Sequence, residues 1–375
     1  MTAGIYLHIP FCKSRCSYCD FATDVYRSND AVERYVAALS CEIVNSTTAA
    51  AHGSVIDTIY FGGGTPSLLK PEQLETILGA IHARFEIDRI AEITMEMNPA
   101  TVTPETLSEF RSSGVNRASF GVQTFDDRSL KLLARGHDAN DARQTFTMLR
   151  NAGFDNVNFD LIAGLPGQTL SGWERNLDEA IRMNPEHLSL YLLEIHAGTP
   201  LAEQLNSRRQ PEPDAELAAE MYEMMIERLA AAGYAQYEIS NFSRPGFESR
   251  HNTKYWTLDP VVAFGVSAHS FDGRSRYANE RDTAKYVALI ESNDTAEVMR
   301  EEIHLASEFI FLGLRLEKGI DLIYFANRFG FDLIARYRSE INDLTEAELV
   351  ALTDQNLRLT LKGKLYSNEV FAVFV

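Results

Sequence analysis

The sequence predicts an α/β fold in which parallel strands alternate with helices and curve into a partial (β/α)6-type barrel, followed by a smaller α+β C-terminal domain. Short apolar runs alternate with stretches of helical periodicity over the first 240 residues. Successive runs begin about 30 to 40 residues apart, which is the length of one βα unit. An open doubly wound sheet has the same periodicity, so this alternative architecture stays open.

Six apolar stretches are expected to be the parallel strands, and a shorter one follows them. They are residues 5–9, 55–61, 92–97, 117–122, 157–162 and 188–195, followed by 235–239. Helical periodicity fills the intervals at 31–44, 71–84, 138–152, 170–183 and 214–232. A further helix is expected to begin after the capping residue Thr103, with Pro104 at its first position, and to end at Gly114.

The alternation of strands and helices stops after residue 240. Prolines and glycines recur between residues 241 and 278, which predicts a loop-rich segment. Mixed helical patterns then return, and residues 359–375 are predicted to form a hairpin. We therefore expect a barrel domain at 1–240, a connecting segment at 241–290 and a small helical, partly winged domain at 291–375.

Composition excludes several classes of protein. Apolar residues make up 45% of the chain and charged residues 23%, as in ordinary globular proteins. The net charge of −18 repels phosphate backbones, so nucleic acid is not expected to be a partner. No apolar run is long enough for a transmembrane segment. The N-terminus lacks the features of a signal peptide, which predicts a cytoplasmic location.

Three cysteines lie close together directly after the first predicted strand. Cys12, Cys16 and Cys19 have the spacing C-x3-C-x2-C, and in a reducing compartment such a group binds metal more often than it forms disulfides. Structural zinc needs a fourth ligand, for which His8 is a candidate. A four-iron cluster bound by three thiolates instead leaves one iron open. The single-loop spacing favours the cluster, and Cys41 is expected to be a small buried residue in a helix.

Polar side chains also gather where the predicted strands end. In parallel βα folds the carboxyl ends of the strands form the active site. These residues are the glycine-rich stretch 62–67, Glu96, Asn98, Gln123, Asp160 and Glu194. Tyr6 and His8 share one face of the first strand. We expect a ligand site at this end of the barrel.

The longer motifs resemble a known family. The strings YLHIPFC, YFGGGTPS, EMNP, RASFGVQTF and DLIAGLPGQT, together with the cysteine spacing, resemble the coproporphyrinogen III oxidase-like branch of the radical S-adenosylmethionine (SAM) superfamily. The resemblance covers residues 1 to about 200 and continues more weakly to the C-terminus. It implies a radical SAM barrel with a [4Fe-4S] cluster bound by Cys12, Cys16 and Cys19. SAM would chelate the open iron, and a reductant such as a flavodoxin or ferredoxin would supply electrons.

The same resemblance implies which residues bind SAM. Tyr18 would pack beside the adenine, and Glu96 would contact the methionine or ribose end. Gly63, Gly64 and Thr65 would meet the methionine amino group and backbone. The remaining positions line the nucleoside site or, in the oxidase, a second SAM molecule; they are Tyr6, Gln123, Arg135 and Asp160.

Within this branch the sequence is closer to HemW-type heme chaperones than to the oxidases. Oxidases have a fourth cysteine where this chain has Phe21, and they have a longer segment before the first strand. The string RHNTKYW at 250–256 and SAHS at 267–270 resemble the chaperone group. This implies heme contact through four residues, with His251 a candidate axial ligand; they are His251, Asn252, Tyr255 and Trp256.

The expected function is therefore to bind heme and deliver it to acceptor hemoproteins. The alternative is an enzyme, an oxygen-independent coproporphyrinogen III dehydrogenase that carries out oxidative decarboxylation in porphyrin biosynthesis. A third possibility is a zinc-stabilised barrel without redox chemistry. The motifs do not assign a catalytic residue.

Overall fold

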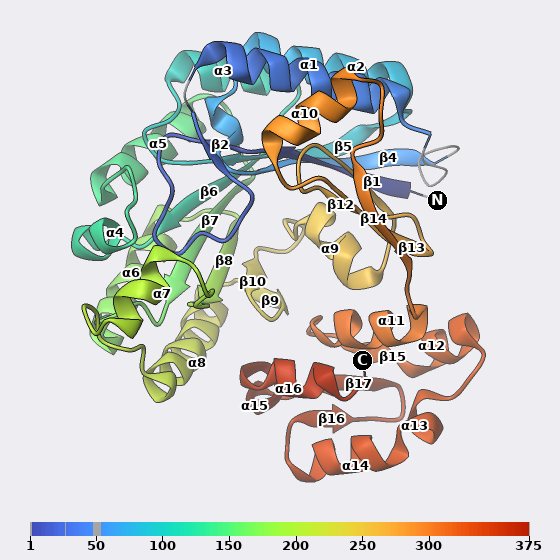
Figure 1. The fold of residues 1–375 in the computed structure, drawn as a ribbon. Helices are drawn as coiled ribbons and strands as arrows, with labels where there is room; N and C mark the ends of the chain where they lie inside the picture. Colours follow the sequence, from blue (N-terminus) through green and yellow to red (C-terminus); the bar gives the residue numbers. More distant parts are fainter. Residues whose placement is uncertain (1, 27, 48–53, 375) are drawn as a thin grey trace.

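The computed structural model describes residues 2–26, 28–47 and 54–374, and a curved sheet of twelve strands is the largest feature of this part of the chain (Figure 1). Six consecutive strands of the sheet are parallel, in the order β1-β4-β5-β6-β7-β8, and β11 (Val261–Phe264) lies beside β1 as a seventh parallel strand. The bounds of the six are β1 (Thr2–Ile9), β4 (Val55–Gly63), β5 (Ile87–Met97), β6 (Arg117–Gln123), β7 (Val157–Ala163) and β8 (His187–Leu192). Each of the six predicted strands overlaps one of these.

The predicted helices are present in the expected order, together with two short helices at 127–132 and 200–206 that were not predicted. They are α1 (Asn29–Asn45), α2 (Pro71–Arg84), α3 (Pro104–Ser112), α4 (Asp127–Leu132), α5 (Ala139–Asn151), α6 (Leu170–Met183), α7 (Pro200–Asn206) and α8 (Ala215–Ala231). The predicted bounds of α2 and α6 agree with the structure. Thr103 caps α3 by accepting a hydrogen bond from the Thr106 backbone N–H, as expected from its place before Pro104.

The helices that alternate with the parallel strands pack on one face of the sheet. Along each strand, alternate residues such as Leu7, Phe61 and Phe120 belong to one apolar core together with residues of α1, α2, α3, α5, α6 and α8. A doubly wound sheet would have helices on both faces. The structure therefore has the barrel-type arrangement. We call the other face of these strands the inner face, and its residues are mostly polar or aromatic.

The prediction of a loop-rich segment at 241–290 was wrong. This part of the chain contains regular elements that extend the sheet at both edges. They are β10 (Asn241–Ser243), α9 (Arg250–Thr257), β11 (Val261–Phe264), β12 (His269–Phe271), β13 (Ser275–Asn279) and α10 (Thr283–Glu291). β9 (Ala235–Glu238) and β10 extend the β8 edge, whereas β11, β12, β13 and β14 (Glu297–Glu302) extend the β1 edge. Strands of three to five residues are too short to show periodicity in a sequence.

The C-terminal region has an apolar core of its own, which includes Ile310, Phe325 and Leu357. Its elements are α11 (Leu305–Leu314), β15 (Ile320–Asp321), α12 (Leu322–Phe329), α13 (Leu333–Arg336), α14 (Arg338–Glu346), β16 (Val350–Leu352), β17 (Asn356–Leu359), α15 (Leu361–Leu365) and α16 (Ser367–Ala372). The hairpin predicted at 359–375 was misplaced, because the hairpin of this region is β16–β17. The last apolar residues, such as Phe371, instead pack on the core as a short helix.

Candidate functional site

The loop that carries the three cysteines is closed at its base by a small parallel bridge. Cys12 lies in β2 (Phe11–Cys12), which pairs with β3 (Asp24–Val25). The tip is held by Ser17, whose backbone N–H donates to the Leu133 carbonyl at 3.0 Å and whose own carbonyl accepts from the Leu201 N–H at 2.8 Å. The loop after the first strand is therefore fixed against two other segments of the barrel.

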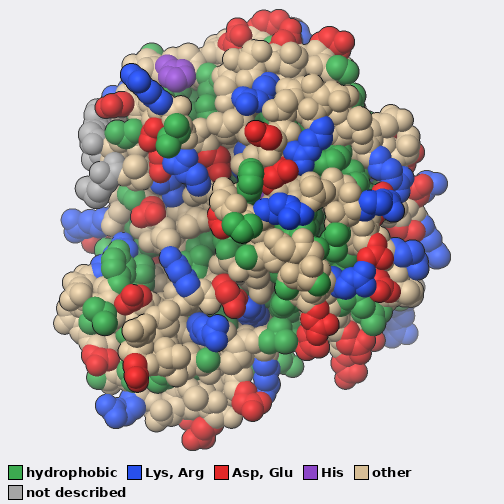
Figure 2. Space-filling view, turned by 180° about the vertical axis from the view of Figure 1, so that it is seen from behind, with side chains coloured by type: hydrophobic (Ala, Val, Ile, Leu, Met, Phe, Trp, Pro, Cys, Tyr) green, Lys and Arg blue, Asp and Glu red, His purple; other side chains and the backbone are tan. Residues whose placement is uncertain are grey.

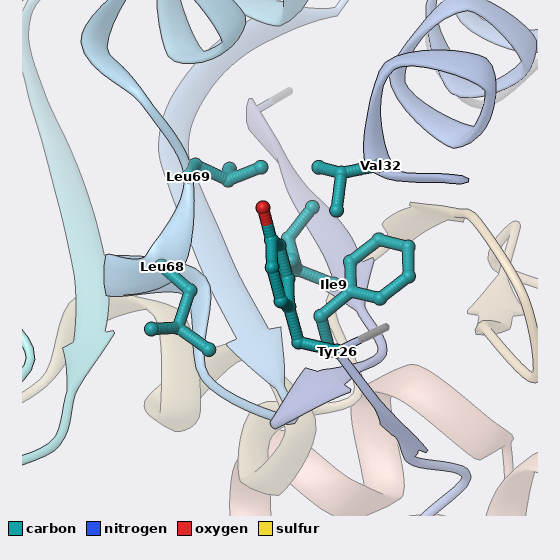
Figure 3. Close-up of a pocket in the computed structure, with 6 residues that line it drawn as sticks. Ile9, Tyr26, Val32, Leu68 and Leu69 are labelled. Atoms are coloured by element: carbon teal, nitrogen blue, oxygen red, sulfur yellow. The ribbon is translucent and has the colours of Figure 1, made fainter. Parts of the chain in front are cut away.

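Apolar side chains pack at the base of the cysteine loop. Six side chains surround a small hollow of about 150 Å³, where they turn toward one another (Figure 3). They are Ile9, Phe11, Tyr26, Val32, Leu68 and Leu69. They come from β1, β2, α1 and the segment after β4, so the cysteine loop rests on the core rather than on solvent.

The three thiols lie near one another and are half-buried. Burial raises the pKa of Cys12 to about 11, against a hydrogen bond from Thr65 Oγ1, and the neighbouring Cys16 and Cys19 raise it further. Burial also raises the pKa of Cys19. Among the described residues, no three His, Cys, Asp or Glu side chains are already gathered around one metal position. Metal binding at these cysteines would therefore release protons and draw the thiolates together.

His8, the candidate fourth ligand for zinc, is engaged elsewhere. Its Nε2 lies 2.8 Å from the Ala22 carbonyl oxygen, and its Nδ1 lies 3.2 Å from the Tyr6 hydroxyl. Burial lowers the pKa of His8, so the ring is neutral and donates at only one nitrogen. A donor set of three thiols from one loop fits a group that takes three thiolates, and it does not supply the closed fourth ligand of structural zinc.

A chain of hydrogen bonds links two of the cysteines across the strand ends. Thr65 Oγ1 donates to Cys12 Sγ at 3.6 Å, and Asn98 Nδ2 donates to Thr65 Oγ1 at 2.9 Å. Arg135 donates to Asn98 Oδ1 at 2.6 Å, to the Gly121 carbonyl at 2.7 Å and to Cys16 Sγ at 3.4 Å. The guanidinium therefore places a positive charge beside a thiol that must become negative when it binds metal.

Asn98 is the centre of this network, although the sequence assigned no cofactor contact to it. Its position after β5, in the string EMNP, was the available signal. A hollow of about 50 Å³, open to solvent, lies beside the network. Its lining includes Lys13, Cys16, Thr65, Asn98, Arg135 and His137. The cysteine loop and the strand ends thus share one recess.

Glu96 and Asp160 lie on the inner face, from β5 and β7. Glu96 accepts hydrogen bonds from the Tyr60 hydroxyl at 2.9 Å and from the Gly63 N–H at 3.1 Å. Burial raises the pKa of Glu96 to about 7, and the Asp160 charge adds to this effect. Burial also raises the pKa of Asp160 to about 6, against a hydrogen bond from Asn158. Both carboxyl groups are therefore poised to change protonation near neutral pH.

Three further residues with a predicted cofactor role have defined contacts near the strand ends; they are Gln123, Gly63 and Tyr18. Gln123 ends β6 with a φ of +66°, and its amide is close to Arg135 and Asn98 around Gly121. Gly63 has a φ of +109°, and a Cβ there would meet the His8 ring, so the position needs glycine. Tyr18 packs on Leu133, Ile162 and Leu165. Glu194 lies beyond β8, 3.7 Å from His196, and is not part of this group.

The stretch 250–257 forms α9 against the inner face of β4 and β5. Glu92 accepts hydrogen bonds from the backbone N–H groups of Arg250 and His251 at the start of the helix. The His251 ring stacks on Tyr60 with centroids 5.1 Å apart. Its Nδ1 lies 2.9 Å from Thr58 Oγ1, and its Nε2 lies 3.2 Å from the Tyr255 hydroxyl. The histidine is thus part of the packing of the inner face.

Two further facts describe this stretch. Burial lowers the pKa of His251 to about 3, so the ring stays neutral, and both its nitrogens have partners. Trp256 lies one residue after Tyr255 and packs under the Arg315 guanidinium, 4.3 Å from the ring centroid. It also contacts the C-terminal core. Asn252, on the same helix, is half-buried. The four predicted heme residues therefore lie together, between the inner face and the C-terminal region.

The surface and the helices add two findings. Figure 2 shows basic and acidic side chains interspersed on the face opposite to the view of Figure 1, without a continuous basic stripe. Among the residues that the structure covers, no helix combines the length and hydropathy needed to cross a membrane.

A barrel of parallel strands with three cysteines after its first strand and glycines after its second defines a radical SAM protein. Residues 6–180 match the Radical SAM superfamily, and residues 301–366 match the HemN C-terminal domain. The chain is 38% identical over 99% of its length to the heme chaperone HemW of Bacillus subtilis, of which it covers 98%. The chain belongs to the HemW family.

The similarity extends beyond proteins named HemW. The mitochondrial radical S-adenosyl methionine domain-containing protein 1 of Bos taurus is 35% identical over 96% of this chain, which covers 84% of that protein. The solved structure of coproporphyrinogen III oxidase (HemN) from Escherichia coli, a radical SAM enzyme, matches with a TM-score of 0.86 and 24% identity. That match covers 100% of this chain and 90% of the other, and it shows that the two folds are the same.

Proposed function

We propose that this protein is a heme chaperone that binds heme and delivers it to acceptor hemoproteins. The observation that carries the proposal is the similarity to the Bacillus subtilis heme chaperone HemW over nearly the whole of both chains. The position of Phe21, two residues after Cys19 and 66% exposed, supports the distinction from the oxidase, because this chain offers no fourth thiol in the loop.

The cofactor part of the proposal concerns the recess at the strand ends. Cys12, Cys16 and Cys19 would hold a [4Fe-4S] cluster, which supplies one-electron chemistry when bound. Arg135 would compensate the charge of the Cys16 thiolate through its hydrogen bond to the sulfur. The reducing cytoplasm, where such thiols stay free, is the proposed location, with a flavodoxin or ferredoxin as reductant.

SAM would bind in the same recess, next to the cysteine loop. Thr65 and Arg135 line this recess. The residues proposed to contact SAM are Tyr6, Tyr18, Gly63, Gly64, Thr65, Glu96, Gln123, Arg135 and Asp160. Glu96 already accepts the Gly63 N–H and the Tyr60 hydroxyl, so it is held in one position to receive a further donor. The raised pKa of Glu96 falls when a cation such as the amino group of SAM lies beside it.

The heme contact is proposed at α9, through His251, Asn252, Tyr255 and Trp256. The His251 Nε2 meets the Tyr255 hydroxyl in the structure, so binding iron there requires that this hydrogen bond is exchanged for the metal. Tyr255→Phe removes the competing partner. If His251 is the axial ligand, Tyr255→Phe keeps heme binding and His251→Ala changes the heme absorbance spectrum. An unchanged spectrum in His251→Ala leaves His251 with the packing role alone.

Transfer of heme tests the proposed function directly. The anaerobically reconstituted protein, loaded with hemin, is mixed with an apo-hemoprotein, and transfer is followed by the absorbance of the acceptor. We expect transfer, and we expect Cys16→Ala to bind hemin because α9 and the cysteine loop are separate elements. The intact protein is also incubated with coproporphyrinogen III, SAM and reductant. If it forms the decarboxylated product, the chaperone proposal is wrong and the protein is a dehydrogenase.

A further inference from the structure

Arg117 is a fully buried cation with no partner. It is the first residue of β6, it is 1% exposed, and it points to the inner face next to Thr94 of β5. Its Nε has no hydrogen-bond acceptor, and its side chain has no hydrogen bond or ion pair to any residue that the structure describes. The neighbouring Thr94 Oγ1 is also buried without a partner. Two adjacent polar groups on the inner face are thus unsatisfied.

The carboxylates of the inner face are occupied by other donors. Glu92 accepts two backbone N–H groups of α9, and Glu96 accepts from Tyr60 and Gly63. Asp160 accepts from Asn158 at 2.7 Å; burial raises its pKa and the nearby Arg117 charge lowers it, but no hydrogen bond or ion pair joins the two described side chains. Glu238, at the edge of the sheet, pairs with Arg315 at 3.3 Å. A buried guanidinium without a hydrogen-bonded counter-charge is unfavourable, so the position of Arg117 indicates an anion that binds from outside the chain.

The surroundings of Arg117 indicate what kind of anion this is. Its charge acts on the hydroxyl groups of Tyr60 and Tyr237, and after burial it is the next cause that lowers the pKa of His187. The Tyr60 ring stacks on Tyr6 and on His251, so the inner face offers flat apolar surfaces beside one cation. Tyr191 is 40% exposed, so solvent reaches this wall. Aromatic surfaces and one guanidinium suit a flat ligand that carries a carboxylate.

We propose that Arg117, with Thr94 beside it, binds a carboxylate group of a ligand on the inner face of the sheet. A heme propionate and the amino-acid carboxylate of SAM share this chemistry. Arg117 begins β6 and Gln123 ends it, so their Cα atoms are about 20 Å apart along the strand, with Gln123 at the end that carries the recess. That position favours the propionate, and this choice rests on the proposed function.

Hemin and hemin dimethyl ester, in which both propionates are esterified, separate carboxylate recognition from the rest of binding. We expect the protein to bind hemin at least about tenfold more tightly than the diester, the effect of a charged hydrogen bond. Arg117→Met should abolish this preference. The control is Arg128→Met, which removes the same charge from an exposed position on α4 and should leave the preference unchanged. Thr94→Val, which removes only the hydroxyl, should reduce the preference by a smaller factor.

Stability distinguishes binding from a structural role. Ligand-free Arg117→Met should have an unchanged or higher Tm, because the substitution removes an uncompensated buried charge and keeps most of the volume. An Arg117→Met protein that does not fold, or has a lower Tm, overturns the inference. Equal affinity of the wild type for hemin and its diester overturns the propionate assignment and leaves the chaperone proposal intact.

Titration with SAM completes the test. If Arg117→Met weakens SAM binding and leaves hemin binding unchanged, the carboxylate belongs to SAM. If the wild type binds no hemin, the proposed function fails, and the SAM titration alone decides the inference. Unchanged affinity of Arg117→Met for both hemin and SAM overturns it.

Discussion

The cysteine loop and α9 are both motif-rich, but their polar groups are used differently. In the cysteine loop the thiols have few partners of their own, and Thr65, Asn98 and Arg135 hold the surroundings in place. In α9 the His251 ring has partners at both nitrogens. The comparison teaches that a metal could bind the thiols without displacing a donor from a saturated ring, whereas iron at His251 must first displace the Tyr255 hydroxyl.

The largest expected effect is on the cysteine loop. Cys12→Ala, Cys16→Ala and Cys19→Ala should each lose the cluster, because two thiolates under-ligate it. Iron and sulfide analysis after anaerobic reconstitution measures this. Cys41→Ala, in α1, and Phe21→Ser, at the exposed position in the loop, should keep full iron content. A full iron content in Cys16→Ala would show that these cysteines are not the ligands of the cluster.

The next effect breaks the packing of α9. His251→Ala leaves the Thr58 hydroxyl and the Tyr255 hydroxyl without a partner, and it removes the ring stacked on Tyr60. We expect the free energy of unfolding to fall by about 3 kcal/mol, since buried groups left unsatisfied cost about 1–3 kcal/mol each. Denaturant titration measures it, with His82→Ala on the exposed side of α2 as the control. Equal stability of the two variants would contradict the packing role.

A smaller effect sharpens the role of Glu96 in cofactor binding. If Glu96 accepts a hydrogen bond from bound SAM, Glu96→Gln should weaken SAM binding by about 1.5–3 kcal/mol, the range for charged hydrogen bonds. The iron content should stay the same, because Glu96 contacts Tyr60 and Gly63 rather than the cysteines. Calorimetry on the reconstituted protein measures the affinity. Glu75→Gln, exposed on α2, is the control. Unchanged affinity for SAM would restrict Glu96 to its structural contacts.

The smallest effect is the pH dependence of stability. Because burial raises the pKa of Glu96 to about 7, the folded state binds this proton more tightly than the unfolded state. Its contribution is therefore fully present below about pH 4.5 and is lost as the pH rises through 7. Ligand-free Glu96→Gln should lose less stability than the wild type between pH 5 and pH 8, by on the order of 2 kcal/mol. If the free energy of unfolding of the two proteins changes with pH in the same way, the Glu96 carboxyl does not have a raised pKa in the folded state.

Local signals predicted the barrel well, because each is contained in a short stretch of sequence. Thr103 before Pro104 marked the start of α3, and the periodicity of 71–84 and 170–183 gave the bounds of α2 and α6. The short strands after residue 240 were not predictable in this way, because their pairing partners lie far away in the sequence. β11, for example, pairs with β1.

The site was predictable in its residue types and less so in its connections. The cysteine spacing, the position of Glu96 near the end of β5 and that of Asp160 within β7 needed only local patterns. The hydrogen-bond partners of His251 lie on β4 and on the next turn of α9. That both ring nitrogens have partners could therefore be known only from the tertiary fold. The same holds for Asn98 as a hub, and for Arg117, whose significance lies in the partners that it lacks.

The placement of Trp256 gives the protein an internal optical reporter. The chain has two tryptophans, and they occupy very different environments. Trp173 is enclosed in the outer core, where its Nε1 donates to the Met221 carbonyl at 2.9 Å. Trp256 is partly exposed and lies under Arg315, about one and a half helical turns after His251. Heme quenches nearby indole fluorescence by energy transfer, so in a Trp173→Phe protein the remaining emission would follow the arrival and departure of heme at α9 in real time, without any added label.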